Sequence, residues 1–172
     1  DYSIHCQDLT NINKCLNSQR KLNLNKNILW LGNSQLHAIN QKISSDKNAP
    51  EILFKKTIEH DFFLLTLSQP NSNLQEHYLL YEYISNLMKV DILILPVVFD
   101  DLRETNIRKD LEGILEIDEI TQKLNENLIG RSIIKKYENS KNIDESIKDF
   151  TNESFQDSSE RYLNNSLSKI SL

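Results

Sequence analysis

Three short runs of apolar residues, each closed by turn-forming residues, constrain the fold of this chain more than any other feature. They lie at 28–31, 62–67 and 92–95. A continuous apolar run of this length predicts a strand that is covered on both faces, as in a parallel sheet. Between the second and third runs, residues 73–88 have helical apolar spacing. Either Ser72 or Asn73 is a good N-cap, and Glu76 is the capping-box partner if Asn73 is the cap. Strands that alternate with helices predict an α/β fold with a parallel sheet and helices on both faces.

The segments around this core are less regular. Residues 1–26 form an approach segment with scattered apolar side chains, and a short helix is expected around Ile12 and Leu16. The turn residues of 44–50 predict a loop. The pattern of 51–58 fits either a helical turn or a short edge strand.

Beyond residue 104 the chain has no further apolar run of strand length. Helical patterns follow there, at 107–115, 117–129 and 143–155. The length of 172 residues suits one domain. We divide it into the approach segment, a sheet core at 27–104 and a mostly helical segment at 105–172. A three-stranded sheet is small, so either the helical segment covers one of its faces or the chain stops before further strands.

Charge and hydropathy exclude two classes of function. The formal net charge is −5, and the basic residues are scattered among acidic ones, whereas a nucleic-acid-binding surface needs a basic patch. The mean hydropathy is −0.51, and no run approaches the roughly 20 apolar residues of a membrane span. The chain begins with Asp1 and not with Met, so it is either processed or cut, and the absence of a signal peptide or N-terminal anchor from it says little about its compartment.

The two cysteines leave two alternatives open. Cys6 and Cys15 are either free thiols or a disulfide that closes a small loop in an oxidising compartment. Neither is close in sequence to a set of metal ligands. Asp100 and Asp101 offer oxygen ligands, but carboxylates adjacent in sequence usually point apart and no second cluster follows. We expect no metal and no cofactor.

Residues that suit acyl transfer follow directly after the three predicted strands. Gly32-Asn33-Ser34 follows the first run, Asn71 lies in the turn after the second, and Asp100 follows the third. The carboxyl ends of parallel strands meet at one edge, where open α/β sheets bind ligands, so these residues are expected to converge. A serine nucleophile needs oxyanion donors and a base, normally histidine. The alternative for Ser34 is the N-cap of a helix at 35–43.

These residues carry a resemblance to a known family. The block Ile28-Leu-Trp-Leu-Gly-Asn-Ser-Gln resembles the first motif of the SGNH (GDSL-like) hydrolase superfamily, in which Gly-Asp-Ser carries the nucleophile. Asn71 lies where that family places an oxyanion-hole glycine. The stretches 73–78 and 95–104 are similar to membrane-anchored SGNH-like proteins of the bacterial cell envelope, of cyanobacteria especially. The resemblance covers residues 27–104.

The resemblance implies a flavodoxin-like α/β fold and a site that contains Ser34, Asn71 and Asp100. It implies a serine esterase or acyl transferase that acts on carbohydrate esters in the cell envelope or periplasm, with a membrane anchor outside this chain. Asp100 lies near the place of the family's Gly-x-Asn-Asp block. An ionised carboxylate accepts hydrogen bonds where the oxyanion needs a donor, and the alternative for Asp100 is a cap of the following helix.

Departures from the family's pattern keep a second function open. Asn33 replaces aspartate and Asn71 replaces glycine, although asparagine adopts left-handed backbone angles more readily than most residues. No Asp-x-x-His block occurs. The histidines are His5, His37, His60 and His77. We expect the base to come from another part of the protein or from a partner chain.

The missing base motivates the alternative function, which is an inactive or truncated SGNH-like scaffold that binds a partner or a glycan. A third alternative is an assembly module that uses the helices of 105–172. His37 is expected to pack on its own helix, and His77 is expected to be buried on the apolar stripe of 73–88.

Overall fold

The computed structural model describes residues 5–6, 9–33, 36, 49–69, 72–97 and 107–150, with side chains excepted for His5 and for residues after Lys141. The chain divides into two units, residues 1–134 and residues 135–172. The first unit contains every described strand. The second contains the later part of one long helix, in which the Lys141 ammonium lies 4.6 Å from the centre of the Tyr137 ring.

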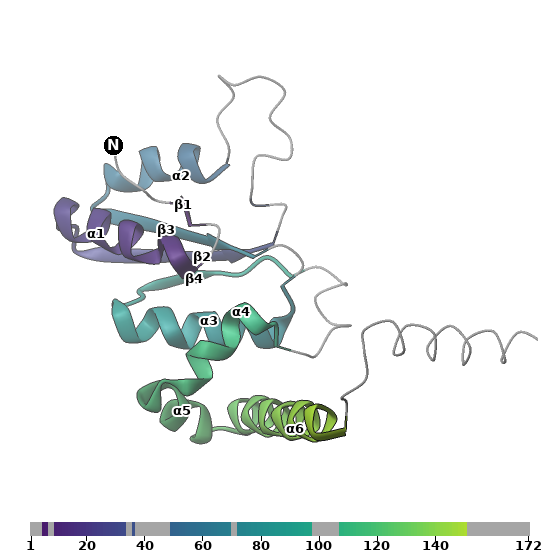
Figure 1. The fold of residues 1–172 in the computed structure, drawn as a ribbon. Helices are drawn as coiled ribbons and strands as arrows, with labels where there is room; N and C mark the ends of the chain where they lie inside the picture. The colour runs from purple at the N-terminus through teal and green to yellow at the C-terminus, as the bar shows by residue number, and fades with distance from the viewer. Residues whose placement is uncertain are drawn as a thin grey trace, which may run out of the picture. The chain divides into compact units, whose positions relative to one another are not determined.

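The described strands form one parallel sheet in the order β1-β3-β2-β4 (Figure 1). Their bounds are β1 His5–Cys6, β2 Lys26–Gly32, β3 Phe62–Ser68 and β4 Ile92–Ile94. β2 pairs with β3 along its whole length and with β4 from Ile28 to Trp30. The three predicted strands are confirmed. β1 was not predicted from the approach segment, because two residues form no apolar run.

The helices lie between and after the strands. Their bounds are η1 Leu9–Asn11, α1 Ile12–Leu22, α2 Ala49–Ile58, α3 Leu74–Leu87, α4 Lys109–Glu112, η4 Gly113–Glu116, α5 Asp118–Asn125 and α6 Leu128–Phe150. Figure 1 shows α2 on one face of the sheet and α3 on the opposite face. The chain steps from β2 outward to β3 and then back across β2 to β4. Right-handed crossovers in opposite directions place their helices on opposite faces, so the predicted α/β arrangement with helices on both faces is confirmed.

The core lies around β2 and β3. Ile28, Leu29 and Leu31 of β2, which include residues of both faces, and every residue of 63–68 in β3 are buried. From α2, the Phe54 ring meets the Phe63 ring edge to face, with 6.1 Å between ring centres. These two strands therefore have the cover on both faces that their apolar runs predict.

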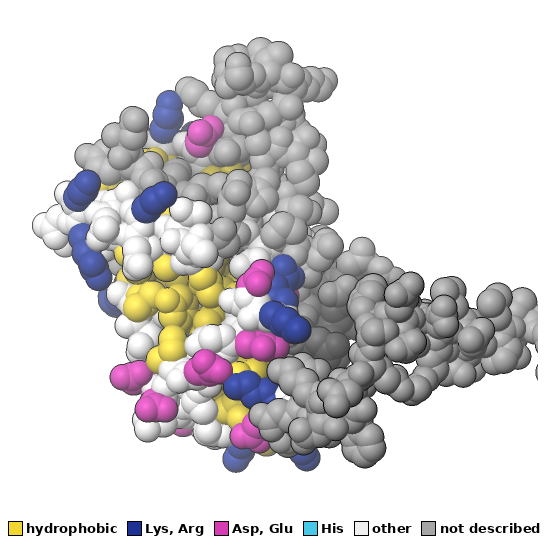
Figure 2. Space-filling model, in the orientation of Figure 1, with side chains coloured by type: hydrophobic (Ala, Val, Ile, Leu, Met, Phe, Trp, Pro, Cys, Tyr) yellow, Lys and Arg dark blue, Asp and Glu magenta, His cyan; other side chains and the backbone are white. Residues whose placement is uncertain are grey.

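β4 differs from this expectation. Ile92 and Leu93 point to opposite faces of the sheet because successive residues of a strand alternate, yet they are 43% and 42% exposed. Figure 2 shows a patch of hydrophobic side chains over this strand. The strand at 92–95 is confirmed, but the prediction that it is covered on both faces is wrong for the part of the chain that the structure describes.

The predicted loop at 44–50 and the open choice at 51–58 are both decided by α2. α2 begins at Ala49, inside the predicted loop 44–50, and it settles the open choice for 51–58 in favour of a helix. Pro50 suits the first turn because that position needs no backbone N–H donor. The predicted helix at 35–43 lies outside the described residues, Leu36 excepted.

The helical patterns at 117–129 and 143–155 are confirmed as helix for most of the residues that the structure describes, but their bounds differ. α5 ends at Asn125, and α6 starts at Leu128 and runs on without the expected gap. Asn127 causes the new start, because its side-chain Oδ1 accepts the backbone N–H of Gly130 at 2.8 Å. Its Nδ2 donates to the Tyr78 hydroxyl at 2.7 Å, which connects this helix start to α3.

Asp91 ties the start of β4 to β2 and gives the protein a pH-dependent contact. Its Oδ2 accepts the backbone N–H of Asn27 at 2.9 Å, and its carboxylate pairs with the Lys89 ammonium. The contact with Lys89, followed by the hydrogen bond from Asn27, lowers the pKa of Asp91. A carboxyl with a lowered folded-state pKa stabilises the fold above its unfolded-state pKa, and that stability is lost as the pH falls through the folded-state pKa.

The variant Asp91→Asn is therefore expected to be less stable than the wild type at neutral pH, and the two proteins should converge as the pH falls below about 4. Urea unfolding followed by circular dichroism between neutral and strongly acidic pH measures this difference. A gap between the two proteins that stays constant over the whole range would contradict the assigned role of the carboxylate.

Candidate functional site

The three predicted catalytic residues, Ser34, Asn71 and Asp100, all lie outside the described residues. The structure therefore does not show whether they come together. It does describe the backbone from which Ser34 and Asn71 extend. Asn33 directly precedes Ser34, and Ser72 directly follows Asn71.

The strand order places Gly32, two residues before Ser34 in the sequence, next to the switch point of the sheet. β2 lies between β3, which follows it in the chain, and β4, which comes after β3. The connections from β2 and β3 therefore run in opposite directions across the sheet. In open α/β sheets the crevice at such a point, outside the carboxyl ends of the strands, is where ligands bind. Gly32 is the last residue of β2 at this edge.

Hydrogen bonds fix the ends of β2 and β3 relative to each other. The Gly32 carbonyl accepts the backbone N–H of Gln69 at 3.0 Å, and the Gln69 carbonyl accepts the N–H of Ser72 at 3.2 Å. The Leu36 N–H donates to the Asn33 carbonyl at 3.0 Å. A Cβ on Gly32 would lie 3.0 Å from Leu36 Cβ and Cδ2, so the close approach of Leu36 favours glycine here.

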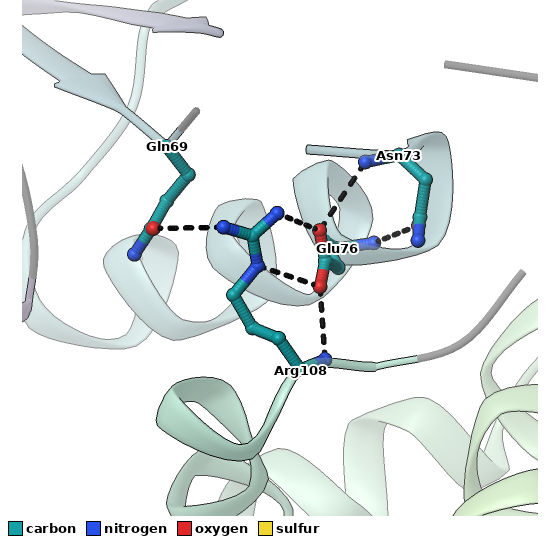
Figure 3. Close-up of polar contacts among 4 residues, drawn as sticks. All are labelled: Gln69, Asn73, Glu76 and Arg108. Carbon is teal, nitrogen blue, oxygen red and sulfur yellow. Dashed lines mark hydrogen bonds and ion pairs between the residues drawn. The ribbon is translucent and has the colours of Figure 1, made fainter. Parts of the chain in front are cut away.

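Glu76, on the first turn of α3, accepts hydrogen bonds from Asn73 and Arg108 (Figure 3). Its residue is 2% exposed. The Asn73 side chain accepts the Glu76 N–H at 3.0 Å, and Glu76 Oε2 accepts the Asn73 N–H at 3.2 Å. The predicted capping box is therefore confirmed.

Arg108 adds an ion pair that the sequence did not predict. Its Nε lies 2.9 Å from Glu76 Oε1 and its second terminal nitrogen lies 2.8 Å from Oε2, and its own backbone N–H donates to Oε1 at 2.9 Å. The remaining terminal nitrogen donates to the Gln69 side chain at 3.4 Å. Figure 3 shows the guanidinium between Gln69 and Glu76. No spacing rule joins residues 32 positions apart, so only the helical pattern that starts at 107 marks this region in the sequence.

The histidines and Ser72 differ in their burial. His77 is 1% exposed, which confirms its prediction as a buried histidine. His60 is exposed, and His37 lies outside the described residues. Ser72 is 1% exposed, and its hydroxyl makes no hydrogen bond with the residues that the structure describes.

Within the described ranges, no group of three or more histidine, cysteine or acidic side chains is arranged to hold a metal ion. Among those same residues, no helix combines the length and the apolar character that crossing a membrane requires.

Comparisons of the chain with protein-family models, with curated proteins and with solved structures found no match. The likeness to SGNH hydrolases therefore rests on the motifs of residues 27–104 alone, and membership of that family is a proposal.

Proposed function

We propose that this chain is an SGNH-like serine esterase or acyl transferase domain that acts on carbohydrate esters of the bacterial cell envelope, with Ser34 as its nucleophile. The observation that carries the proposal is the strand order. Gly32 ends the central strand at the switch point of a parallel sheet, and Ser34 follows two residues later. This is the edge at which open α/β sheets bind ligands.

In the proposed reaction the Ser34 hydroxyl attacks the acyl carbonyl and loses its proton to a base. The carbonyl oxygen becomes an oxyanion, which the backbone N–H of Asn71 stabilises. The sugar oxygen then leaves with a proton, and water or an acceptor hydroxyl takes the acyl group from the serine. The base is a histidine from another part of the protein or from a partner chain. Asp100 is the third site residue, and its carboxylate suits a substrate hydroxyl better than the oxyanion.

A fluorophosphonate probe on the full-length protein tests this proposal, because the probe bonds covalently to an activated serine. We expect one labelled site, which Ser34→Ala removes completely. The matched control is Ser140→Ala, which removes an exposed hydroxyl that donates to the Tyr137 carbonyl on α6; it should keep full labelling. Absence of labelling in the wild type, or equal labelling of wild type and Ser34→Ala, would overturn the assignment.

The absence of an Asp-x-x-His block in the sequence favours a second candidate, an inactive scaffold that binds a glycan at the same edge. For this candidate we expect binding of an O-acetylated oligosaccharide in calorimetry with no release of acetate and no labelling. Release of acetate would exclude it.

A further inference from the structure

We propose that Arg108 is a positioning residue for this site: through Glu76 and its own contact with Gln69 it holds Gln69 and Asn73, the described residues that flank the turn predicted after β3. Its effect on catalysis rests on the proposed function, whereas its hold on the turn does not. Gln69 precedes the turn and Asn73 follows it, and the guanidinium reaches both sides (Figure 3).

The two ends of the turn are held in different ways. On the far side, Glu76 accepts the Asn73 N–H, so the carboxylate that binds Arg108 also fixes the start of α3. On the near side, Arg108 donates directly to the Gln69 side chain. The turn is closed within itself by the hydrogen bond from the Ser72 N–H to the Gln69 carbonyl. A shift of Arg108 would therefore act on both ends of the turn at once.

The same contacts extend to the end of β2. The Gln69 N–H donates to the Gly32 carbonyl at 3.0 Å, and Gly32 lies two residues before Ser34. Arg108, Gln69 and Gly32 thus form a continuous series of hydrogen bonds from the segment before α4 to the end of β2. Displacement of a reacting group by a small distance slows a reaction strongly, so a residue that fixes this geometry affects the rate without touching the substrate.

The burial of Glu76 supports a role beyond capping. A capping box needs only a carboxylate at the helix surface, but Glu76 is 2% exposed and is paired with a residue far away in the sequence. Buried ion pairs add little net stability compared with apolar packing, and their best-attested use is to select one geometry. Only arginine has the planar fork of donors that bonds both carboxylate oxygens and still has a nitrogen for Gln69.

The first test is amide hydrogen exchange measured by NMR on the full chain, with Arg108→Lys as the variant. Lysine keeps the charge and loses the fork. We expect the amides of Gln69 and Ser72 to exchange about tenfold faster while core amides of β3 stay unchanged. The matched control is Asn127→Ala, which removes two hydrogen bonds that involve none of Gln69, Glu76 and Arg108 and should leave both amides as they are. Unchanged exchange in Arg108→Lys would overturn the proposal.

The second test is the rate of fluorophosphonate labelling at Ser34, split into probe affinity and maximal rate. We expect Arg108→Lys to lower the maximal rate about tenfold with the affinity unchanged, and Asn127→Ala to change neither. Faster exchange without slower labelling would overturn the catalytic role. If the wild type is not labelled at all, the proposed function fails, and the exchange measurement still decides whether Arg108 holds the turn.

Discussion

Replacement of Glu76 by alanine is expected to lower the free energy of unfolding by about 3 kcal/mol. The change removes the acceptor of four hydrogen bonds, of which three come from Arg108 and one from the Asn73 N–H. These donors then lose their partner at a buried position, since Glu76 is 2% exposed. The Arg108 side chain is 27% exposed, so water can bind some of the donors that lose the carboxylate. The expected loss of stability therefore lies at the low end of the range for breaking a buried ion pair. Urea unfolding at neutral pH measures it.

Two further variants make this result specific. Glu76→Gln keeps the shape and one acceptor oxygen, so we expect a smaller loss of about 1–2 kcal/mol. Glu59→Ala removes a carboxylate that is exposed after α2, and the expected change is within about 0.5 kcal/mol. A loss below about 1 kcal/mol in Glu76→Ala would show that the ion pair with Arg108 does not hold the folded state together.

Local signals explain which parts of the fold could be predicted. β2 and β3 are continuous apolar runs, and α3 starts with an N-cap and its capping-box partner, so a few neighbouring residues determine each element. The position of β4 is different. Its run has the composition of an interior strand, but its place at the edge depends on the order in which strands pair. No local pattern contains that order.

The site divides in the same way. The sequence predicted that the turns after β2 and β3 share one edge, and the bond between Gly32 and Gln69 confirms this for the two strands. Arg108 could not be predicted, because its contacts with Glu76 and Gln69 form only when distant segments fold together. The chemistry of Ser34, Asn71 and Asp100 stays a prediction.

The disulfide between Cys6 and Cys15 decides the alternative that the sequence left open. Both residues are buried, and the bond joins β1 to α1 across a sequence separation of 9. β1 pairs with β3 through only two residues, which is too short a strand to hold itself in place. The disulfide therefore supplies the attachment that the hydrogen bonds of β1 do not.

Reduction of this disulfide is expected to lower the free energy of unfolding by about 2.5–3 kcal/mol, because the loop it closes no longer restricts the unfolded chain. Urea unfolding with and without dithiothreitol measures the loss. The control is the double variant Cys6→Ala and Cys15→Ala. Its free energy of unfolding should equal that of the reduced wild type and should not change when dithiothreitol is added. If the wild type unfolds at the same urea concentration with and without dithiothreitol, the disulfide does not stabilise the fold as proposed. Disulfides persist mainly in oxidising compartments, and the proposed location in the cell envelope is one of these.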